Sequence, residues 1–390
     1  MNLKSGLSIL AALALASCSK DVKVTVSNES DIDRTQATVE LSADSVLNRI
    51  GSSFCYVTDE NGKEIPSQLT YDGKLIFQAD IPAGATISFK VCPADTLHSY
   101  PALTAGRLYP ERADDLAWEN EVNGYRAYGP STQNKGERAF GYDVFFKHKT
   151  DSLILEKLYG PETSPATWQK ADSLRKIDPA LAEDFINSIS YHIDHGLGMD
   201  CYAVGPTLGD GVAAILVNDS ICFQWCYKDA QVLDNGPLRF TARLDFAPIQ
   251  AGNDTLLTEH RIISLDAGSY LNRAKVWYEG QTSPLSIAMG FPLRDDFQPA
   301  VGETYVAYSD PTQGDDNGRA LLGLINPNGF ERNATISNHI LGVSLLQPSD
   351  TLDYYWGFAW DREDIKDIEN WTKYLGSFQT AISQPLVIKY

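Results

Sequence analysis

The sequence predicts a mainly β protein, built from a large antiparallel β-sandwich, a small N-terminal β-module and a short helical insertion. Short runs that alternate hydrophobic and polar residues recur along the 390 residues, and turns rich in Gly, Pro, Asn and Asp separate them. One stretch near the middle carries helix-capping signals instead. At roughly 100 to 200 residues per domain, the length allows two or three domains, or one large β-domain with a smaller partner.

The composition is that of an acidic globular protein, with 51 Asp plus Glu against 32 Lys plus Arg and a net charge of -19. A protein that binds nucleic acid needs a basic face that displaces counterions from the phosphates. A module that binds a membrane surface through its charge needs a basic face as well. We therefore expect no nucleic-acid partner, and contact with a membrane only through a lipid anchor.

Residues 1–17 have the pattern of a secretory signal peptide. Lys4 precedes the apolar run Leu7 to Leu15, which is shorter than the ~20 residues of a spanning helix. The following Leu15-Ala16-Ser17-Cys18 resembles the bacterial lipobox, in which the cysteine becomes the lipidated first residue of the mature chain. We expect lipidation at Cys18 and a location in the cell envelope, on a periplasmic or surface face of the outer membrane.

Residues 18–100 are predicted to form the small β-module. Period-two alternation marks three of its strands, and Asn61-Gly62 and Asp72-Gly73 supply hairpin turns. Cys55 and Cys92 lie in strand-like runs and are the predicted disulfide pair. The three alternating strands are 23–26, 37–41 and 86–91.

Residues 101–390 are assigned to the sandwich, with the helical insertion at about 161–196. Ser164-Pro165 and Asp178-Pro179 each place a capping residue before a proline at the first helical position, and Gly196 suits a helix end. Apolar residues at helical spacing between Leu181 and His192 predict a helix that packs on a sheet. The rest of the chain is predicted to form strands and one further helix, at 364–375. The predicted strands are 211–217, 221–227, 238–246, 256–265, 271–278, 305–308, 340–346, 353–360 and 385–390.

The sharpest chemical signal is the segment from Tyr191 to Gly196, which holds two of the six histidines, His192 and His195. Asp194, Asp200 and Tyr202 follow closely. Imidazoles oriented by carboxylates are suited to proton transfer. The alternative is that His195 interacts with the helix dipole and that His192 is a packing residue.

Two other groups of residues are candidates. On a strand, Glu259 and Arg261 share one face and His260 takes the other, so an acid and a cation can stand together above a cleft or simply form a sheet-surface ion pair. Lys147 and His148 form a basic patch in an acidic chain, suited either to an anionic sugar or to a solubilising edge.

Aromatic side chains offer sugar-stacking surfaces, and most of them are expected in the core. Trp118 and Trp356 are candidates, with Tyr354 to Trp360 as the expected exposed set. P-loop, GxSxG, HExxH, EF-hand and dinucleotide motifs are absent from the sequence, and no CxxC pair accompanies the cysteines. We expect neither a cofactor nor a metal.

Three segments, 112–120, 126–130 and 195–205, resemble the domain-of-unknown-function 4861 family of secreted bacterial lipoproteins, which is linked to polysaccharide degradation, notably that of pectin. This resemblance implies a location and a substrate class. The strand-rich second half, with Ser264 to Arg273, is more loosely similar to the galactose-mutarotase-like supersandwich. In that fold a histidine and an acid face the sugar from the concave side of the sheet, and His192, His195 and Glu259 are the positions that could match.

The leading hypothesis is a carbohydrate-active lipoprotein that acts on uronate-containing oligosaccharides by lyase, hydrolase or epimerase chemistry. His192 or His195 would be the base and Glu259 a further catalytic residue, while Arg112, Arg126 or Lys147 would neutralise the developing enolate. The alternatives are a non-catalytic glycan-binding lipoprotein and a structural envelope protein. The candidate substrate-binding residues are Arg112, Trp118, Arg126, Lys147, His148, Asp194, Asp200, Tyr202, Arg261 and Trp356.

Overall fold

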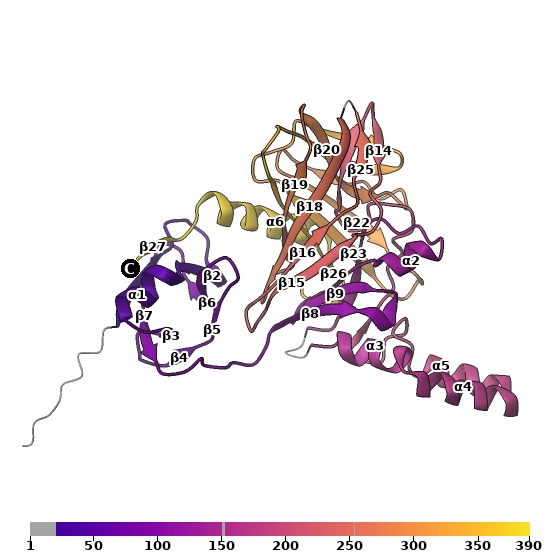
Figure 1. The fold of residues 1–390 in the computed structure, drawn as a ribbon, viewed down its shortest axis with the longest axis horizontal. Helices are drawn as coiled ribbons and strands as arrows, with labels where there is room; N and C mark the ends of the chain where they lie inside the picture. The colour runs from indigo at the N-terminus through magenta and orange to yellow at the C-terminus, as the bar shows by residue number, and fades with distance from the viewer. Residues whose placement is uncertain (1–20, 150–152, 253) are drawn as a thin grey trace, which may run out of the picture.

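The computed structural model describes residues 21–149, 153–252 and 254–390, and the predicted mainly β fold is confirmed (Figure 1). The strands pair antiparallel within each of its sheets. The signal peptide and Cys18 lie outside the described residues. No helix in the described part of the chain is both long and apolar enough to cross a membrane.

The N-terminal part forms a small β-module with its own core. Its alternating strands turn valines such as Val24 and Val91 inward, where they are fully buried against helix α1 (Ala43–Ile50). The last strand of the chain, β27 (Val387–Lys389), adds to this module by pairing with β1. The boundary near residue 100 stays a prediction. The other strands of the module are β1 (Val22–Ser27), β2 (Arg34–Ser42), β3 (Phe54–Thr58), β4 (Glu64–Ile65), β5 (Ser67–Leu69), β6 (Lys74–Ile81) and β7 (Thr86–Ala94).

The predicted bridge between Cys55 and Cys92 is wrong, because both thiols are free. In the β3–β7 ladder Cys92 lies opposite Tyr56, and Cys55 lies opposite Pro93. Residues directly opposite each other share a face, and successive residues alternate faces. The two cysteines therefore point to opposite sides of the same sheet.

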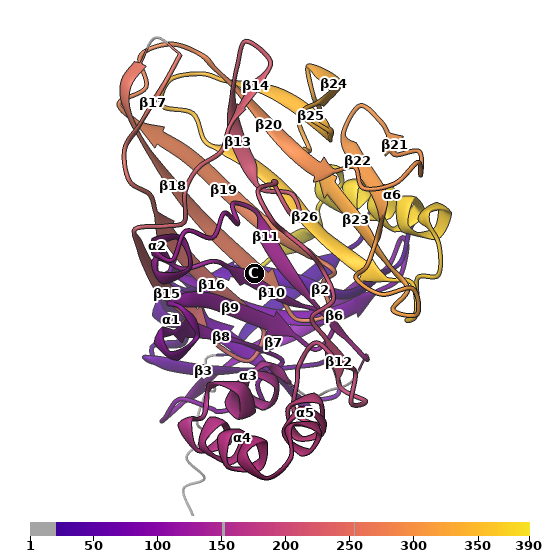
Figure 2. The same ribbon diagram turned by 90° about the vertical axis from the view of Figure 1, so that its right-hand side faces the viewer.

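A nine-stranded sheet and a five-stranded sheet form the sandwich (Figure 2). The inward residues of the nine-stranded sheet, such as Phe240, Ile263 and Trp356, enter the largest core cluster. Its strands are β15 (Asp229–Asn235), β16 (Arg239–Asp245), β18 (Asp254–Asp266), β19 (Leu271–Glu279), β26 (Leu352–Trp360), β23 (Arg319–Ile325), β22 (Tyr305–Pro311) and β21 (Ala300–Val301), with β17 (Ile249–Ala251) beside β18. The five-stranded sheet contains β14 (Ser220–Cys222), β13 (Ala213–Val217), β20 (Leu285–Pro292), β25 (His339–Leu346) and β24 (Arg332–Ile336).

Helix α6 (Ile368–Ser383) covers part of the outer face of the nine-stranded sheet and leads to the module (Figure 1). Asp367 caps its first turn by accepting a hydrogen bond from the amide of Asn370 at 2.8 Å. The buried Trp371 Nε1 donates to the carbonyl of Leu322 at 3.0 Å. A Cβ at Gly323 would come within 2.6 Å of the Trp371 ring, so this glycine permits the close contact.

A further five-stranded sheet, which we call the small sheet, carries the helical insertion (Figure 2). The two predicted helix starts are confirmed, since helices begin at Pro165 and Pro179. The Asp178 side chain accepts from the Ala180 amide at 2.9 Å, whereas the Ser164 side chain makes no capping hydrogen bond. The predicted helix end at Gly196 is wrong, because the last of these helices ends at Asn187. The small sheet contains β8 (Thr104–Tyr109), β9 (Asp115–Asn120), β10 (Gly124–Ala127), β11 (Tyr142–Lys147) and β12 (Gly198–Met199). The turn η1 (Pro110–Arg112) and the helices α2 (Pro130–Asn134), α3 (Leu155–Thr163), α4 (Pro165–Ile177) and α5 (Pro179–Asn187) accompany it.

The predicted packing of the helix at 181–192 on a sheet is wrong, and the helix that packs there is α3. Leu158 and Tyr159 of α3 enter a core cluster against the small sheet. In contrast, Leu181 of α5 is 46% exposed, and α4 and α5 pack mainly on each other. Because α5 ends at Asn187, His192 and His195 lie in the following turn and share no helix face.

Candidate functional site

The candidate site lies on the outer face of the small sheet. Along β9, Leu116 and Trp118 enter the main core, so Asp115 takes the opposite face. Arg126 of β10 lies directly opposite Asp143 of β11, and the two form an ion pair. We call the residues gathered here the acid–guanidinium cluster: Arg112, Asp115, Arg126, Tyr128, Asp143, Tyr191, His192 and Asp200.

Arg126 is the centre of the cluster. Its Nη2 donates to the hydroxyl of Tyr128 at 2.9 Å and lies 3.6 Å from Asp200 Oδ2. Its Nε lies 3.9 Å from Asp115 Oδ2, beyond hydrogen-bond reach. Within the described residues, Nε and Nη1 of Arg126 and Oδ2 of Asp115 make no hydrogen bond although they are buried. The buried guanidinium therefore has donors that the described residues leave unpaired.

The segment that follows β10 closes one side of the cluster. The Gly129 amide donates to Asp115 Oδ1 at 2.9 Å. A Cβ at Gly129 would lie 2.0 Å from the Asp114 carbonyl oxygen, so only glycine allows this approach. The Tyr128 hydroxyl donates to Asp143 Oδ2 at 2.8 Å and so ties the same segment to β11.

Arg112 and His192 form the outer part of the cluster. Arg112 Nε donates to the hydroxyl of the buried Tyr191 at 3.0 Å. The His192 side chain is 53% exposed, and its Nδ1 lies 2.9 Å from the Asp200 backbone carbonyl and 4.0 Å from Asp200 Oδ2. Because a carbonyl can only accept, Nδ1 carries the hydrogen and Nε2 keeps its lone pair when the ring is neutral. His192 can thus accept a proton from the solvent side.

Two carboxyl groups of the cluster titrate far above the ordinary range of an aspartic acid. Burial raises the pKa of Asp115 to about 6. Burial, and then the neighbouring charge of Asp143, raise the pKa of Asp200 to about 8. Asp200 therefore holds its proton more strongly than an ordinary aspartic acid does, and it lies beside the exposed imidazole of His192.

The structure brings together four of the predicted site residues: Arg112, Arg126, His192 and Asp200. They come from segments as far apart as residues 112 and 200. The sequence reasoning did not select Asp115, Tyr128, Asp143 or Tyr191 as site residues. Asp115 and Tyr128 could have been selected from the sequence, since both lie in the segments that carry the family resemblance. Asp143 is revealed only by its position opposite Arg126 in the sheet.

His195, Asp194 and His148 lie outside this cluster. His195 is exposed, and its Nε2 lies 3.0 Å from the Asn187 carbonyl. His148 contacts Asp194 Oδ2 at 2.7 Å with Nε2 and Glu363 Oε1 at 2.8 Å with Nδ1. These contacts link the turn after α5 to the segment that precedes α6. Nothing in this geometry joins either histidine to the guanidinium groups.

Lys147 was expected to contact an anionic substrate, and the structure corrects this. The residue is only 1% exposed, and its Nζ lies 2.6 Å from Glu119 Oε2 on the outer face of the small sheet. Burial lowers the pKa of Lys147. Glu119 also accepts from the amides of Ile154 and Leu155, each at 2.8 Å, where α3 begins. Lys147 and Glu119 therefore hold α3 on the sheet.

The expected exposed aromatic set is wrong, because Trp356 is 0% exposed and stacks on Tyr142 with ring centroids 4.1 Å apart. Trp118 is also fully buried, and its Nε1 donates to Asn272 Oδ1 at 2.8 Å. Tyr202 is buried as well, with the Arg294 guanidinium 4.7 Å from its ring centroid. These three residues are core rather than ligand surface.

Glu259 and Arg261 do share a strand face, but it faces inward instead of lining a cleft. Both are buried and paired with each other, and Arg261 donates to the Tyr142 hydroxyl at 3.1 Å. The opposite face carries His260, which stacks on Trp277. The alternation was predicted correctly, and the choice of the ligand-facing side was not.

The fold and the cluster define a multi-sheet, mainly β protein that holds a buried acid–arginine site under a helical insertion. Residues 26–388 match the family described as "Domain of unknown function (DUF4861)", and the chain belongs to this family. A curated relative, "Uncharacterized protein P7" of Formosa agariphila (strain DSM 15362 / KCTC 12365 / LMG 23005 / KMM 3901 / M-2Alg 35-1), is 27% identical over 415 residues, which cover 97% of each chain.

Two solved structures from Enterococcus faecalis resemble the fold at low identity. One, an alpha-mannosidase from strain V583, has a TM-score of 0.47 and 10% identity, with 95% of this chain and 46% of that chain covered. The other, a protein in the glycosyl hydrolase family 38, has a TM-score of 0.48 and 9% identity, with 95% of this chain and 47% of that chain covered. This chain thus spans about half the length of either solved chain.

Proposed function

We propose that the protein is an enzyme acting on uronate-containing oligosaccharides and that the acid–guanidinium cluster is its acid–base site. The observation that supports this is the placement of a buried carboxyl group with a raised pKa, Asp200, between the buried guanidinium of Arg126 and the exposed imidazole of His192. An arginine, a carboxylic acid and an imidazole placed together suit a substrate that carries a negative charge and exchanges protons. A uronate sugar is such a substrate, because the C–H bond next to its carboxylate is acidic.

The chemistry that fits best is β-elimination. Arg112 and Arg126 hold the sugar carboxylate and stabilise the enolate that forms when the proton on the adjacent carbon leaves. His192 Nε2 accepts that proton. The electron pair of the broken C–H bond then forms a C=C bond as the glycosidic C–O bond breaks, and Asp200 gives its proton to the departing oxygen. The products are an unsaturated uronate and a shortened sugar chain.

The test is to incubate the protein with a panel of pectic oligosaccharides and to follow both the products and the ultraviolet absorbance of an unsaturated uronate. We expect His192→Ala to lower kcat about 10²- to 10⁴-fold, the usual contribution of a general base. His98→Ala, which removes a half-buried histidine of the module that is not part of the cluster, is the control and should have the activity of the wild type.

An equal loss of activity in His195→Ala would contradict the choice of His192 as the base. Products that lack the unsaturated uronate would contradict elimination and would indicate hydrolysis or epimerisation instead. If the wild type binds these oligosaccharides without converting them, the enzyme proposal fails and the protein is a non-catalytic glycan-binding protein.

We also propose that the protein is anchored in the cell envelope through lipid on Cys18, in keeping with the lipobox-like Leu15-Ala16-Ser17-Cys18. We expect wild-type protein expressed in a bacterium to incorporate labelled palmitate and to sediment with the membranes. Cys18→Ala should lose both properties, because it removes the lipobox cysteine that would carry the acyl chains. Cys55→Ala, which removes a buried thiol elsewhere, is the control. Membrane association that survives in Cys18→Ala would contradict the anchor.

A further inference from the structure

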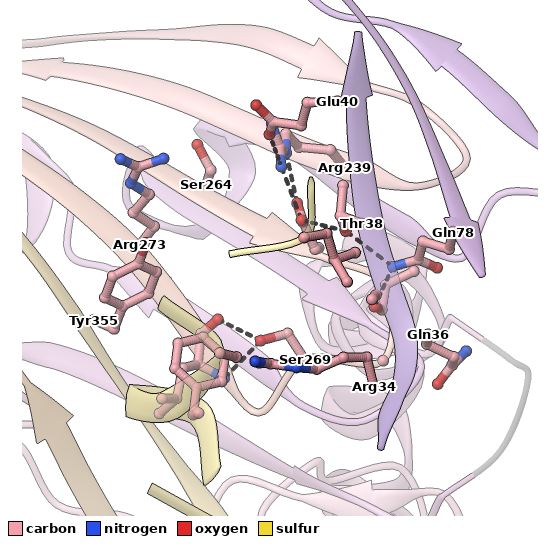
Figure 3. A pocket seen from close by; sticks show the side chains of 18 of the residues that line it. Arg34, Gln36, Thr38, Glu40, Gln78, Arg239, Ser264, Ser269, Arg273 and Tyr355 are labelled. Carbon is pink, nitrogen blue, oxygen red and sulfur yellow. Dashed lines mark hydrogen bonds and ion pairs between the residues drawn. The ribbon is translucent and has the colours of Figure 1, made fainter. Parts of the chain in front are cut away.

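A second site lies on a different sheet from the acid–guanidinium cluster. A cavity of about 720 Å³, which we call the module cavity, separates the N-terminal module from the outer face of the nine-stranded sheet. Strands β2 and β6 form one wall, β16, β18, β19 and β26 form the floor, and α6 forms the far side (Figure 3). Its volume lies within the ~300–1,000 Å³ of small-molecule sites.

The floor of the module cavity is a row of polar side chains that runs across four neighbouring strands. Thr241 lies opposite Ser264, Ser264 opposite Arg273, and Arg273 opposite Tyr355. Directly opposite residues share a sheet face, so all four side chains point into the cavity, which they line. The alternate residues of the same strands, such as Ala274 and Tyr354, fill the main core.

The module is held over this floor by polar contacts along one edge. Arg239 Nη2 lies 2.8 Å from Glu40 Oε1, and Arg239 Nε lies 2.5 Å from Asp266 Oδ1. Thr38 donates to Asp266 Oδ2 at 2.8 Å, and Gln78 Nε2 donates to the Ala267 carbonyl at 2.8 Å. The cavity is thus fixed in width at this edge, and Figure 3 shows Thr38, Glu40, Gln78 and Arg239 there.

On the far side, the segment after α6 is joined to the module. Arg34 Nη2 donates to the Gln384 carbonyl at 3.0 Å, and β27 pairs with β1. Tyr355 packs against Phe378 of α6 with ring centroids 5.1 Å apart. The chain therefore closes both ends of the cavity with its own contacts, and Ser264, Arg273 and Tyr355 stay partly exposed between them.

The charges of the module cavity are balanced, in contrast to those of the chain. Five basic side chains line it, and so do five acidic ones, whereas the whole chain carries a charge of -19. Arg273 is 42% exposed and binds Asp353 through Nε and Nη2, which leaves its Nη1 free to donate. Lys275, two residues along the same face, forms none of the ion pairs present among the described residues. Two donors of positive charge therefore stand side by side on the floor.

We propose that the module cavity binds a short acidic oligosaccharide, independently of catalysis at the acid–guanidinium cluster. Arg273 and Lys275 bind the sugar carboxylate by charge-assisted hydrogen bonds. The hydroxyl of Ser264 and the amide oxygen of Gln78 bind sugar hydroxyls. The ring of Tyr355, and that of Tyr71, which is 47% exposed, pack against the C–H faces of the sugar rings. The site positions a chain segment and needs no acid or base.

The test is calorimetric titration of the full-length protein with a trisaccharide of galacturonate and with the neutral galactose trisaccharide of the same length. We expect the acidic sugar to bind at least tenfold more tightly, and its binding to weaken with added salt. Arg273→Ala should weaken binding of the acidic sugar at least tenfold. Ser264→Trp, which fills the floor and removes no charge, should do the same.

Arg243→Ala is the matched control, because Arg243 lies on the same sheet face beside Asp245 but does not line the cavity. It should bind like the wild type. Wild-type protein that binds neither sugar, or Arg273→Ala and Ser264→Trp variants that bind normally, would overturn the site. Equal binding of the neutral sugar would overturn the acidic ligand class. If His192→Ala loses turnover but still binds the acidic sugar, the result bears on the proposed catalytic activity alone. The proposed binding site in the module cavity is not affected by it.

Discussion

Replacing Glu119 by alanine should lower the free energy of unfolding by about 3–5 kcal/mol, the cost of leaving a buried ion pair without one partner. Lys147 would keep its charge in a place that is only 1% exposed, with Nζ deprived of the carboxylate at 2.6 Å. The amides of Ile154 and Leu155 would also lose their acceptor at the start of α3. Urea unfolding of the variant and the wild type, followed by tryptophan fluorescence, measures the difference.

Glu156→Ala is the matched control, because Glu156 also pairs with an arginine, Arg107, but its side chain is 64% exposed. Its loss should cost less than about 1 kcal/mol. The double variant Glu119→Ala/Lys147→Met should recover part of the stability, since it removes the unpaired charge but not the unpaired amides. A Glu119→Ala variant as stable as Glu156→Ala would contradict the structural role of this pair.

The protein should become less stable as the pH rises from about 5 to 9. Burial raises the pKa of Asp115 to about 6, of Asp310 to about 7 and of Asp200 to about 8, whereas an unfolded aspartate titrates near ~3.9. Between these values the folded state binds more protons than the unfolded state, so the free energy of unfolding falls with pH. The stabilisation that these three protonated carboxyl groups provide is complete below about pH 4. It is lost as the pH rises through their folded-state pKa values.

Thermal unfolding at a series of pH values measures this effect, which should reach a few kcal/mol across the range. Asp200→Asn keeps the shape of the neutral acid, and its stability should change less between pH 6 and 9 than that of the wild type. Asp172→Asn, on the exposed side of α4, should keep the wild-type slope. Stability that rises with pH in the wild type would contradict the raised pKa values.

Much of the fold could be predicted from local signals. Hydrophobic patterns located strands such as β1, β18 and β19 but missed those of the small sheet. The Ser164-Pro165 and Asp178-Pro179 pairs located two helix starts, because capping and side-chain alternation depend only on nearby residues. The site could be predicted only in part. Arg112, Arg126, His192 and Asp200 were selected from their residue types, whereas Lys147 and Trp356 were selected for the same reason and lie outside the cluster.

The sequence by itself determined that Glu259 and Arg261 share one face of a strand and that Ser264 belongs to the other. The tertiary structure alone decided which face is covered: Arg261 is enclosed in the core, whereas Ser264, Arg273 and Tyr355 form the floor of the module cavity. The reason is that alternation gives every strand two equivalent faces. Which of them is buried depends on ladders and layers that join residues far apart in the chain, as Arg273 and Tyr355 are.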